Sequence, residues 1–175
     1  DLTAVCLKRL SEVLSDCKPD RVLVHGDTTT SFVAALACYY LKIPVAHVEA
    51  GLRTDNIYSP WPEEMNRRLT DTICDLHFAP TQKAKENLLE SGIPEACIHI
   101  TGNTVIDALI DISRRIEANK NIIQSINPEI LKLINEKKII LVTGHRRENF
   151  GKAFEEICEA LVIIADRPNV QIIYP

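Results

Sequence analysis

Long hydrophobic runs are missing from this 175-residue chain. The longest nearly apolar stretch, Phe32–Leu41, is about half of the roughly 20 residues that a membrane-spanning helix needs. The N-terminus has the apolar spacing of an amphipathic helix and lacks the basic-then-apolar pattern of a signal peptide. The sequence therefore predicts a cytoplasmic protein without a membrane segment.

An excess of positive charge is also missing, because 20 Lys and Arg stand against 24 Asp and Glu, a formal net charge of −4. Nucleic-acid-binding domains usually carry a basic stripe, so we expect no nucleic-acid partner. A few local donors can still bind an anionic ligand. The six cysteines include no C-x-x-C pair, and most have apolar neighbours in the sequence. This pattern favours buried, reduced thiols over zinc ligands or disulfides.

Four common catalytic and cofactor motifs are absent from the sequence: G-x-G-x-x-G, the Walker A loop, H-E-x-x-H and G-x-S-x-G. Dinucleotide-binding, P-loop, zinc-protease and serine-hydrolase functions therefore lack support. We expect no cofactor and no metal.

Helical and strand patterns alternate along the chain, which predicts an α/β protein with a parallel sheet. The predicted helices cover residues 1–17, 29–41, 62–74, 81–92, 104–118 and 151–165. The predicted strands cover residues 21–25, 45–48, 76–79, 98–101, 139–143 and 170–174. Residues 119–127 are predicted to be a polar loop before a short helix that starts at Pro128. We place a domain boundary after residue 103, giving domains 1–103 and 104–175. Because the chain lacks an initial Met and stops directly after a predicted strand, we expect it to be part of a longer protein.

Polar, glycine-bearing segments follow three of the predicted strands: His25–Thr30, Glu49–Thr54 and Gly144–Gly151. Ligands of parallel α/β sheets bind beyond the carboxyl ends of the strands. We therefore expect all three segments to lie at one sheet edge and to form a site.

Each carboxylate of these segments also has a purely structural interpretation. Asp27 could cap the helix that follows it, since Asp is a favoured N-cap residue. Glu49 ends an apolar strand and could form a salt bridge with Arg53. Glu63 and Glu64 could simply complement a helix dipole, and only one of the two needs a further role.

The Gly144–Gly151 segment is more specific, because a strand, a glycine turn, basic side chains and a helix N-terminus together suit an anion. Arginine adds bidentate recognition of phosphate. His145 could instead be an ordinary loop histidine, and the charges could merely cap the helix. His25 and His47, within or beside strands, are expected to be structural.

Four segments together resemble a known family. His25–Thr30, His47–Thr54, Ser59–Arg67 and Thr143–Gly151 are similar to motifs of the non-hydrolysing UDP-N-acetylglucosamine 2-epimerases of bacteria. The hydrolysing relatives differ at these motifs. The resemblance implies a two-domain GT-B fold of Rossmann-like parallel sheets with the site in the cleft between the domains. This chain would hold the later part of the first domain and the beginning of the second.

The resemblance also implies a reaction, the reversible conversion of UDP-N-acetylglucosamine to UDP-N-acetylmannosamine through a 2-acetamidoglucal intermediate. Asp27, Glu49, Glu63 and His145 match the family's active-site positions as catalytic residues, and Asp27, Glu49 and His145 also as substrate-binding residues. Which carboxylate removes the C2 proton and which returns it stays open. Arg146 falls on the motif for a second, activating substrate molecule, and relatives suggest a homodimer that serves cell-envelope polysaccharide synthesis. The alternatives are a GT-B glycosyltransferase with a UDP-sugar donor and a non-catalytic nucleotide-sugar sensor.

Overall fold

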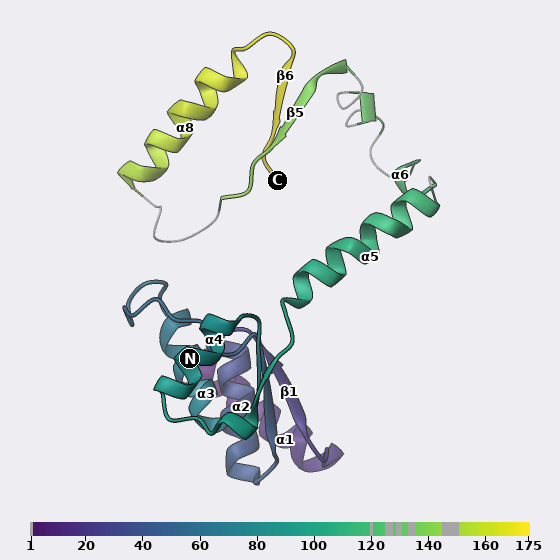
Figure 1. Ribbon diagram of the computed structural model, residues 1–175. Helices are drawn as coiled ribbons and strands as arrows, with labels where there is room; N and C mark the ends of the chain where they lie inside the picture. Colours follow the sequence, from purple (N-terminus) through teal and green to yellow (C-terminus); the bar gives the residue numbers. More distant parts are fainter. Residues whose placement is uncertain (1, 120, 125–127, 129–130, 133–135, 145–150) are drawn as a thin grey trace. The chain divides into compact units, whose positions relative to one another are not determined.

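The computed structural model describes residues 2–119, 121–124, 128, 131–132, 136–144 and 151–175 (Figure 1). The chain divides into two compact units, Asp1–Ile106 and Asp107–Pro175. The assignment of residues 1–103 and 104–175 to two domains of a longer protein stays a prediction.

The first unit is built on a four-stranded sheet with a helix between successive strands. Its elements are α1 (Leu2–Cys17), β1 (Val22–His25), α2 (Thr29–Leu41), β2 (Val45–Val48), α3 (Glu63–Ile73), β3 (Leu76–Ala79), α4 (Gln82–Glu90), the 3-10 helix η1 (Glu95–Cys97) and β4 (Ile98–Ile100). The predicted helices and strands of this part of the chain are all present, with ends shifted by one or two residues.

The strands pair in the order β1-β2-β3-β4, and every neighbouring pair is parallel. The predicted parallel α/β class is therefore confirmed. Val24, His47, His77 and Ile98 stand side by side in one cross-strand row, and all four are buried. Right-handed crossovers between sequential parallel strands place the connecting helices on one face, which explains why this row is covered.

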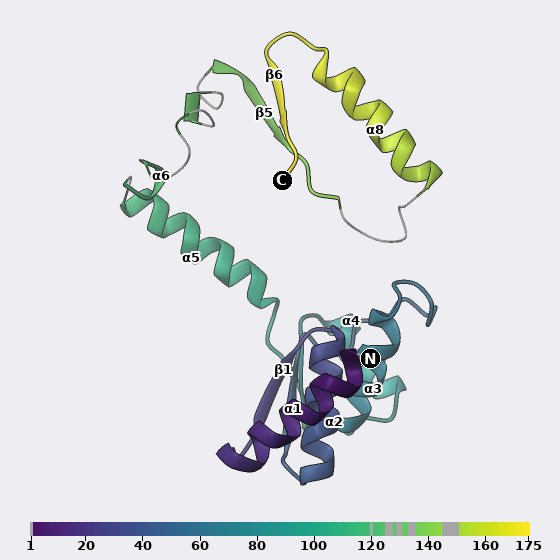
Figure 2. The ribbon, with the colours of Figure 1, turned by 180° about the vertical axis from the view of Figure 1, so that it is seen from behind.

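Helix α2 shows how local chemistry sets the element ends. The Thr28 hydroxyl oxygen accepts a hydrogen bond from the Ser31 N–H at 3.2 Å, so Thr28 is the N-cap. Asp27 therefore does not cap this helix, and the structural interpretation of Asp27 is wrong. Lys42 ends the helix in the left-handed conformation at φ 58°. The almost wholly apolar α2 packs against α1, α3 and the strands β1 and β2 (Figure 2).

Two apolar clusters form the core of the first unit. One joins α1, β1, α2 and β2 and includes Leu14, Val24 and Cys38, and the other joins β3, α4 and β4 around Leu88.

Burial raises the pKa of the Cys74 thiol to about 12, so this thiol stays protonated at neutral pH. Only Cys38 and Cys74 are buried, and the expectation of burial is wrong for the exposed Cys17 and Cys158.

The second unit contains a separate two-stranded sheet. Its elements are α5 (Thr104–Ala118, which begins in the first unit), α6 (Asn121–Gln124), β5 (Lys138–Leu141), α8 (Lys152–Ala165) and β6 (Val170–Ile173). Strands β5 and β6 are parallel. The short α6 occupies part of the segment predicted to be a polar loop. The helix predicted from Pro128 lies mostly outside the described residues.

In the described part of the chain, no helix has the length and apolarity to cross a membrane.

Candidate active site

The turns after β1 and β2 lie side by side in the first unit. His25 and Val48 are register partners at the carboxyl ends of the two strands, and the Gly26 N–H donates to the Val48 carbonyl at 3.0 Å. A Cβ added to Gly26 would lie 3.4 Å from Oε2 of Glu49. Two of the three predicted segments therefore meet. The third follows β5 in the other sheet, so the expectation of a single shared sheet edge is wrong.

Glu49 occupies a strained backbone position at this edge. Its φ is 67°, in the left-handed region that residues other than glycine rarely adopt, and such strain often accompanies function. His25 Nε2 lies 3.5 Å from the Glu49 carboxylate, which keeps 29% of its side chain exposed. Arg53 pairs with Asp71 instead, so the structural interpretation of Glu49 as an Arg53 partner is wrong.

Asp27 is held by two consecutive residues of α3. Arg67 Nη2 lies 2.5 Å from Asp27 Oδ2, and the Asn66 side-chain amide donates to the Asp27 backbone carbonyl at 2.9 Å. Arg67 is buried, whereas 29% of the Asp27 side chain is exposed. The carboxylate is thus fixed from the protein side and open on the other.

Glu63 and Glu64 have opposite environments at the start of α3. Glu64 is fully buried and accepts from Arg68 Nε at 2.8 Å and from the Thr54 N–H at 3.2 Å. These contacts commit Glu64 to holding the loop that precedes α3. Within the described residues, the half-buried Glu63 carboxylate has no ion-pair partner, which leaves it free to meet a ligand. The two neighbouring carboxylates therefore differ in burial and in partners.

A buried polar network lies beneath the two turns. His47 Nδ1 is 2.6 Å from Asp71 Oδ1, its Nε2 is 2.9 Å from the Gly26 carbonyl oxygen, and Arg53 donates to Asp71 Oδ2 at 2.8 Å. Burial of Asp71 opposes its ionisation, but the hydrogen bonds and charges of His47 and Arg53 outweigh this and hold the pKa of Asp71 below its ordinary value. Asp71 is therefore an ionised carboxylate at neutral pH.

The sequence analysis missed Asn66, Arg67 and Asp71, which α3 points into the protein. Polar residues on a helix usually face solvent, since helices usually bury their apolar stripe, so their polarity alone does not predict this burial. One signal was available, because Asn66, Arg67, Thr70 and Asp71 recur at helical spacing. The Met65 and Leu69 side chains are more than one-third exposed on the other side.

The predicted His145 and Arg146 lie outside the described residues. Next to them, the Tyr174 hydroxyl donates to the Gly144 carbonyl, so β6 is linked to the segment after β5. The predicted roles of His145 and Arg146 stay predictions.

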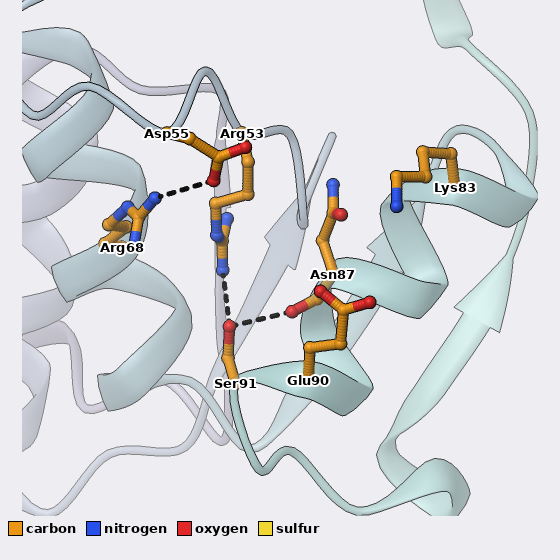
Figure 3. Close-up of a pocket in the computed structure, with 7 residues that line it drawn as sticks. All are labelled: Arg53, Asp55, Arg68, Lys83, Asn87, Glu90 and Ser91. Carbon is orange, nitrogen blue, oxygen red and sulfur yellow. Dashed lines mark hydrogen bonds and ion pairs between the residues drawn. The ribbon is translucent and has the colours of Figure 1, made fainter.

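A polar pocket of about 330 Å³ opens between α3 and α4 (Figure 3). It is lined by Arg53, Asp55, Arg68, Lys83, Asn87, Glu90 and Ser91. Arg53 extends from its loop towards the Ser91 hydroxyl, and Arg68 points towards Asp55 (Figure 3). Both guanidinium groups already pair with the buried carboxylates of Asp71 and Glu64. Because none of the predicted carboxylates lines this pocket, it is distinct from the candidate active site.

The arrangement suits proton transfer at a bound ligand. Asp27 and Glu49 stand partly exposed at neighbouring strand ends, Asp27 held by α3 and Glu49 beside His25, and carboxylates so placed can act as general acids or bases. Among the described residues, no group of His, Cys, Asp and Glu is arranged to hold a metal ion.

Comparison with known proteins gives a consistent result. A protein-family model described as UDP-N-acetylglucosamine 2-epimerase matches residues 1–175. The chain is 52% identical over 176 residues to the UDP-N-acetylglucosamine 2-epimerase of Salmonella typhimurium, and 53% identical over 180 residues to that of Campylobacter jejuni. Each alignment covers 100% of this chain and 47% of the relative. The chain therefore spans about half the length of the curated relatives it matches.

Solved structures agree. The UDP-GlcNAc 2-epimerase from Neisseria meningitidis, bound to UDP-GlcNAc, is 46% identical with a TM-score of 0.92, over 99% of this chain and 47% of that one. The enzyme from Methanocaldococcus jannaschii, in complex with UDP-GlcNAc and UDP, is 39% identical with a TM-score of 0.82, over 98% of this chain and 46% of that one.

Proposed function

Because the chain belongs to the UDP-N-acetylglucosamine 2-epimerase family, we propose that the protein containing it interconverts UDP-N-acetylglucosamine and UDP-N-acetylmannosamine. The observation that carries the proposal is the family match over residues 1–175, which includes both strand-end carboxylates, Asp27 and Glu49. Residues 1–103 would belong to the first, and 104–175 to the second, domain of a GT-B fold.

The reaction proceeds by elimination and re-addition. A base takes the proton from C2 of the sugar, the C1–O bond breaks, and its electron pair leaves with UDP. The resulting 2-acetamidoglucal stays bound beside UDP. UDP then adds back to C1, and a proton returns to C2 on the opposite face. The elimination needs a group that accepts the C2 proton, and the re-addition needs a group that donates a proton to C2 on the opposite face.

Asp27, Glu49, Glu63 and His145 are the proposed catalytic residues. The contacts of Asp27 with Asn66 and Arg67 support a fixed orientation. The Glu63 carboxylate, which has no ion-pair partner within the described part of the chain, suits a group that meets substrate. His145 precedes a helix in a basic segment, where an anionic diphosphate would be stabilised. Asp27, Glu49 and His145 would also bind the substrate.

The proposal also covers the regulation of the enzyme and its oligomeric state. A second UDP-N-acetylglucosamine molecule would act as an activator through Arg146, and the enzyme would be a cytoplasmic homodimer that supplies cell-envelope polysaccharide synthesis. A cytoplasmic site is in keeping with six cysteines that form no disulfide among the described residues.

Proton exchange in deuterated water tests the function. Protein at the full length of its relatives, given UDP-N-acetylglucosamine alone, should incorporate deuterium at C2 and form the manno epimer. Mass spectrometry and NMR of the nucleotide sugar measure both. Sugar transfer that needs an added acceptor would indicate a glycosyltransferase, and tight binding without any exchange would indicate a sensor. Either result contradicts the proposal.

A further inference from the structure

His47 has a backbone carbonyl on one side and a carboxylate on the other. Its Nε2 is 2.9 Å from the Gly26 carbonyl oxygen and its Nδ1 is 2.6 Å from Asp71 Oδ1, and the ring is fully buried. Gly26 immediately precedes Asp27 in the turn after β1. The histidine thus connects helix α3 to the backbone that carries a proposed catalytic carboxylate.

Both partners of the ring can only accept hydrogen bonds. A carbonyl oxygen has no proton to give, and the Asp71 carboxylate already accepts from Arg53 at 2.8 Å. A neutral imidazole has a single N–H, so it would leave one buried acceptor facing a bare nitrogen, which is costly. The charged and titratable groups around the ring are Asp71 from α3, Arg53 behind Asp71, and His77, its register partner on β3.

We propose that His47 is a doubly protonated positioning residue, held by Asp71, that fixes the Gly26 carbonyl and thereby the orientation of Asp27. The Asn66 amide holds the next carbonyl, that of Asp27, at 2.9 Å. Two successive peptide groups of one turn are therefore held by separate side-chain donors. The kinetic part of this inference rests on the proposed function of Asp27.

His77 supplies a matched control in the same chain. It is equally buried, and its Nε2 lies 2.9 Å from the backbone carbonyl of Asp71. Its Nδ1 has no hydrogen-bond partner among the described residues. His77 needs only one N–H and is expected to be the neutral Nε2–H tautomer. The two neighbouring histidines should therefore differ in protonation.

Nitrogen-15 NMR of histidine-labelled, full-length protein tests the protonation directly. At neutral pH, both ring nitrogens of His47 should show N–H couplings, and only one ring nitrogen of His77 should do so. His47→Gln and His77→Gln assign the signals. If no histidine of the wild type shows two N–H couplings, the proposal is overturned, whether or not either variant folds.

Two further measurements test the positioning. In His47→Gln, the Gly26 carbonyl carbon signal should shift and epimerase kcat should fall about 10²-fold with little change in KM, because small misplacements of catalytic groups cost this much. His77→Gln should leave the Gly26 signal and kcat near wild type. An unmoved Gly26 signal in His47→Gln overturns the proposal even if the protein proves not to be an epimerase. Loss of kcat in both variants alike would reduce His47 to a core residue.

Discussion

At the scale of single residues, carboxylates that share a sequence motif have different partners. Glu64 is closed off by Arg68 and the Thr54 backbone, whereas Glu63 has no ion-pair partner among the described residues. Asp27 is paired and still 29% exposed. Charge and sequence position alone do not distinguish such roles, because partners can lie far away in the chain, as Arg67 does at 40 positions from Asp27.

The Glu49→Gln and Glu63→Gln variants should each lower epimerase turnover of the full-length protein by at least about 10²-fold, the usual scale for loss of acid–base help. The amide keeps the shape of each side chain and removes its ability to exchange a proton. Steady-state assays with UDP-N-acetylglucosamine measure the effect. Glu12→Gln, on the exposed side of α1, is the control. Wild-type turnover in both site variants would show that these carboxylates are structural.

Arg146→Ala should change activation by substrate more than chemistry. Its place in the basic segment after Gly144 suits a second anionic substrate molecule. Plots of rate against UDP-N-acetylglucosamine should lose their sigmoidal shape or fall strongly at low substrate. His145→Ala should instead reduce turnover at saturating substrate. If the Arg146→Ala curve matches that of the wild type, Arg146 is only a solvated charge.

Asp71→Asn should destabilise the first unit by about 3 kcal/mol at neutral pH, because it leaves His47 and Arg53 buried without their anion. The pKa of Asp71 is lowered by folding, so its stabilisation is present above the unfolded value of about 3.9 and is lost as pH falls through the folded pKa. The stability gap between wild type and variant should therefore narrow in acid. Denaturant unfolding followed by the single Trp61 measures it. A gap that stays constant down to about pH 2 would contradict this linkage.

At the scale of elements, the sequence predicts the positions of the strands well, but it does not predict which side of α3 is buried. The β-branched run Val22–Val24 is typical of a buried strand, and β1 contains it. Helix α3 inverts the usual pattern, since its polar side is buried by partners on other elements. The helical spacing of these polar residues is a local signal, but it cannot identify their partners, because Asp71 is satisfied by His47, 24 positions away in the sequence.

The N-cap of α2 is another feature that local sequence does not determine. Asp27 and Thr28 are both favoured N-cap residues, and only Thr28 caps α2. Arg67, 40 positions along the chain, engages the Asp27 carboxylate and decides between them. The motif after β1 was therefore correctly placed at a strand end, whereas the partner of its carboxylate could not be predicted.

Gly51 fixes the approach of α4 to the turn after β2. Its φ is 87°, and an added Cβ would lie 2.3 Å from the Ala84 carbonyl oxygen, which belongs to the helix backbone. Gly51→Ala should therefore cost about 3 kcal/mol or more of unfolding free energy. Gly92→Ala is the matched control, since Gly92 has φ 84° but open space around it, and should cost only about 1–2 kcal/mol. Equal losses in denaturant melts would show that conformation alone, and not the contact with α4, requires Gly51.

At the scale of the whole molecule, the residues assembled here should not suffice for catalysis. The chain spans about half the length of its relatives, and positioning of the nucleotide supplies much of an enzyme's rate. The 175-residue chain alone should neither exchange deuterium into C2 nor form the manno epimer, whereas the full-length protein should do both. Deuterium at C2 with the chain alone would show that the carboxylate segments of the first unit suffice for proton transfer.

The contacts of α3 with the turn after β1 determine how many elements must be moved together if this site is to be transferred to another protein. Gly26 and Asp27 are held by His47 from β2 and by Asn66 and Arg67 from α3. Grafting the hexapeptide His25–Thr30 onto another parallel sheet would carry the carboxylate without its supports. The smallest portable module is β1, β2 and α3 together, so protein engineers should exchange these three elements as one cassette.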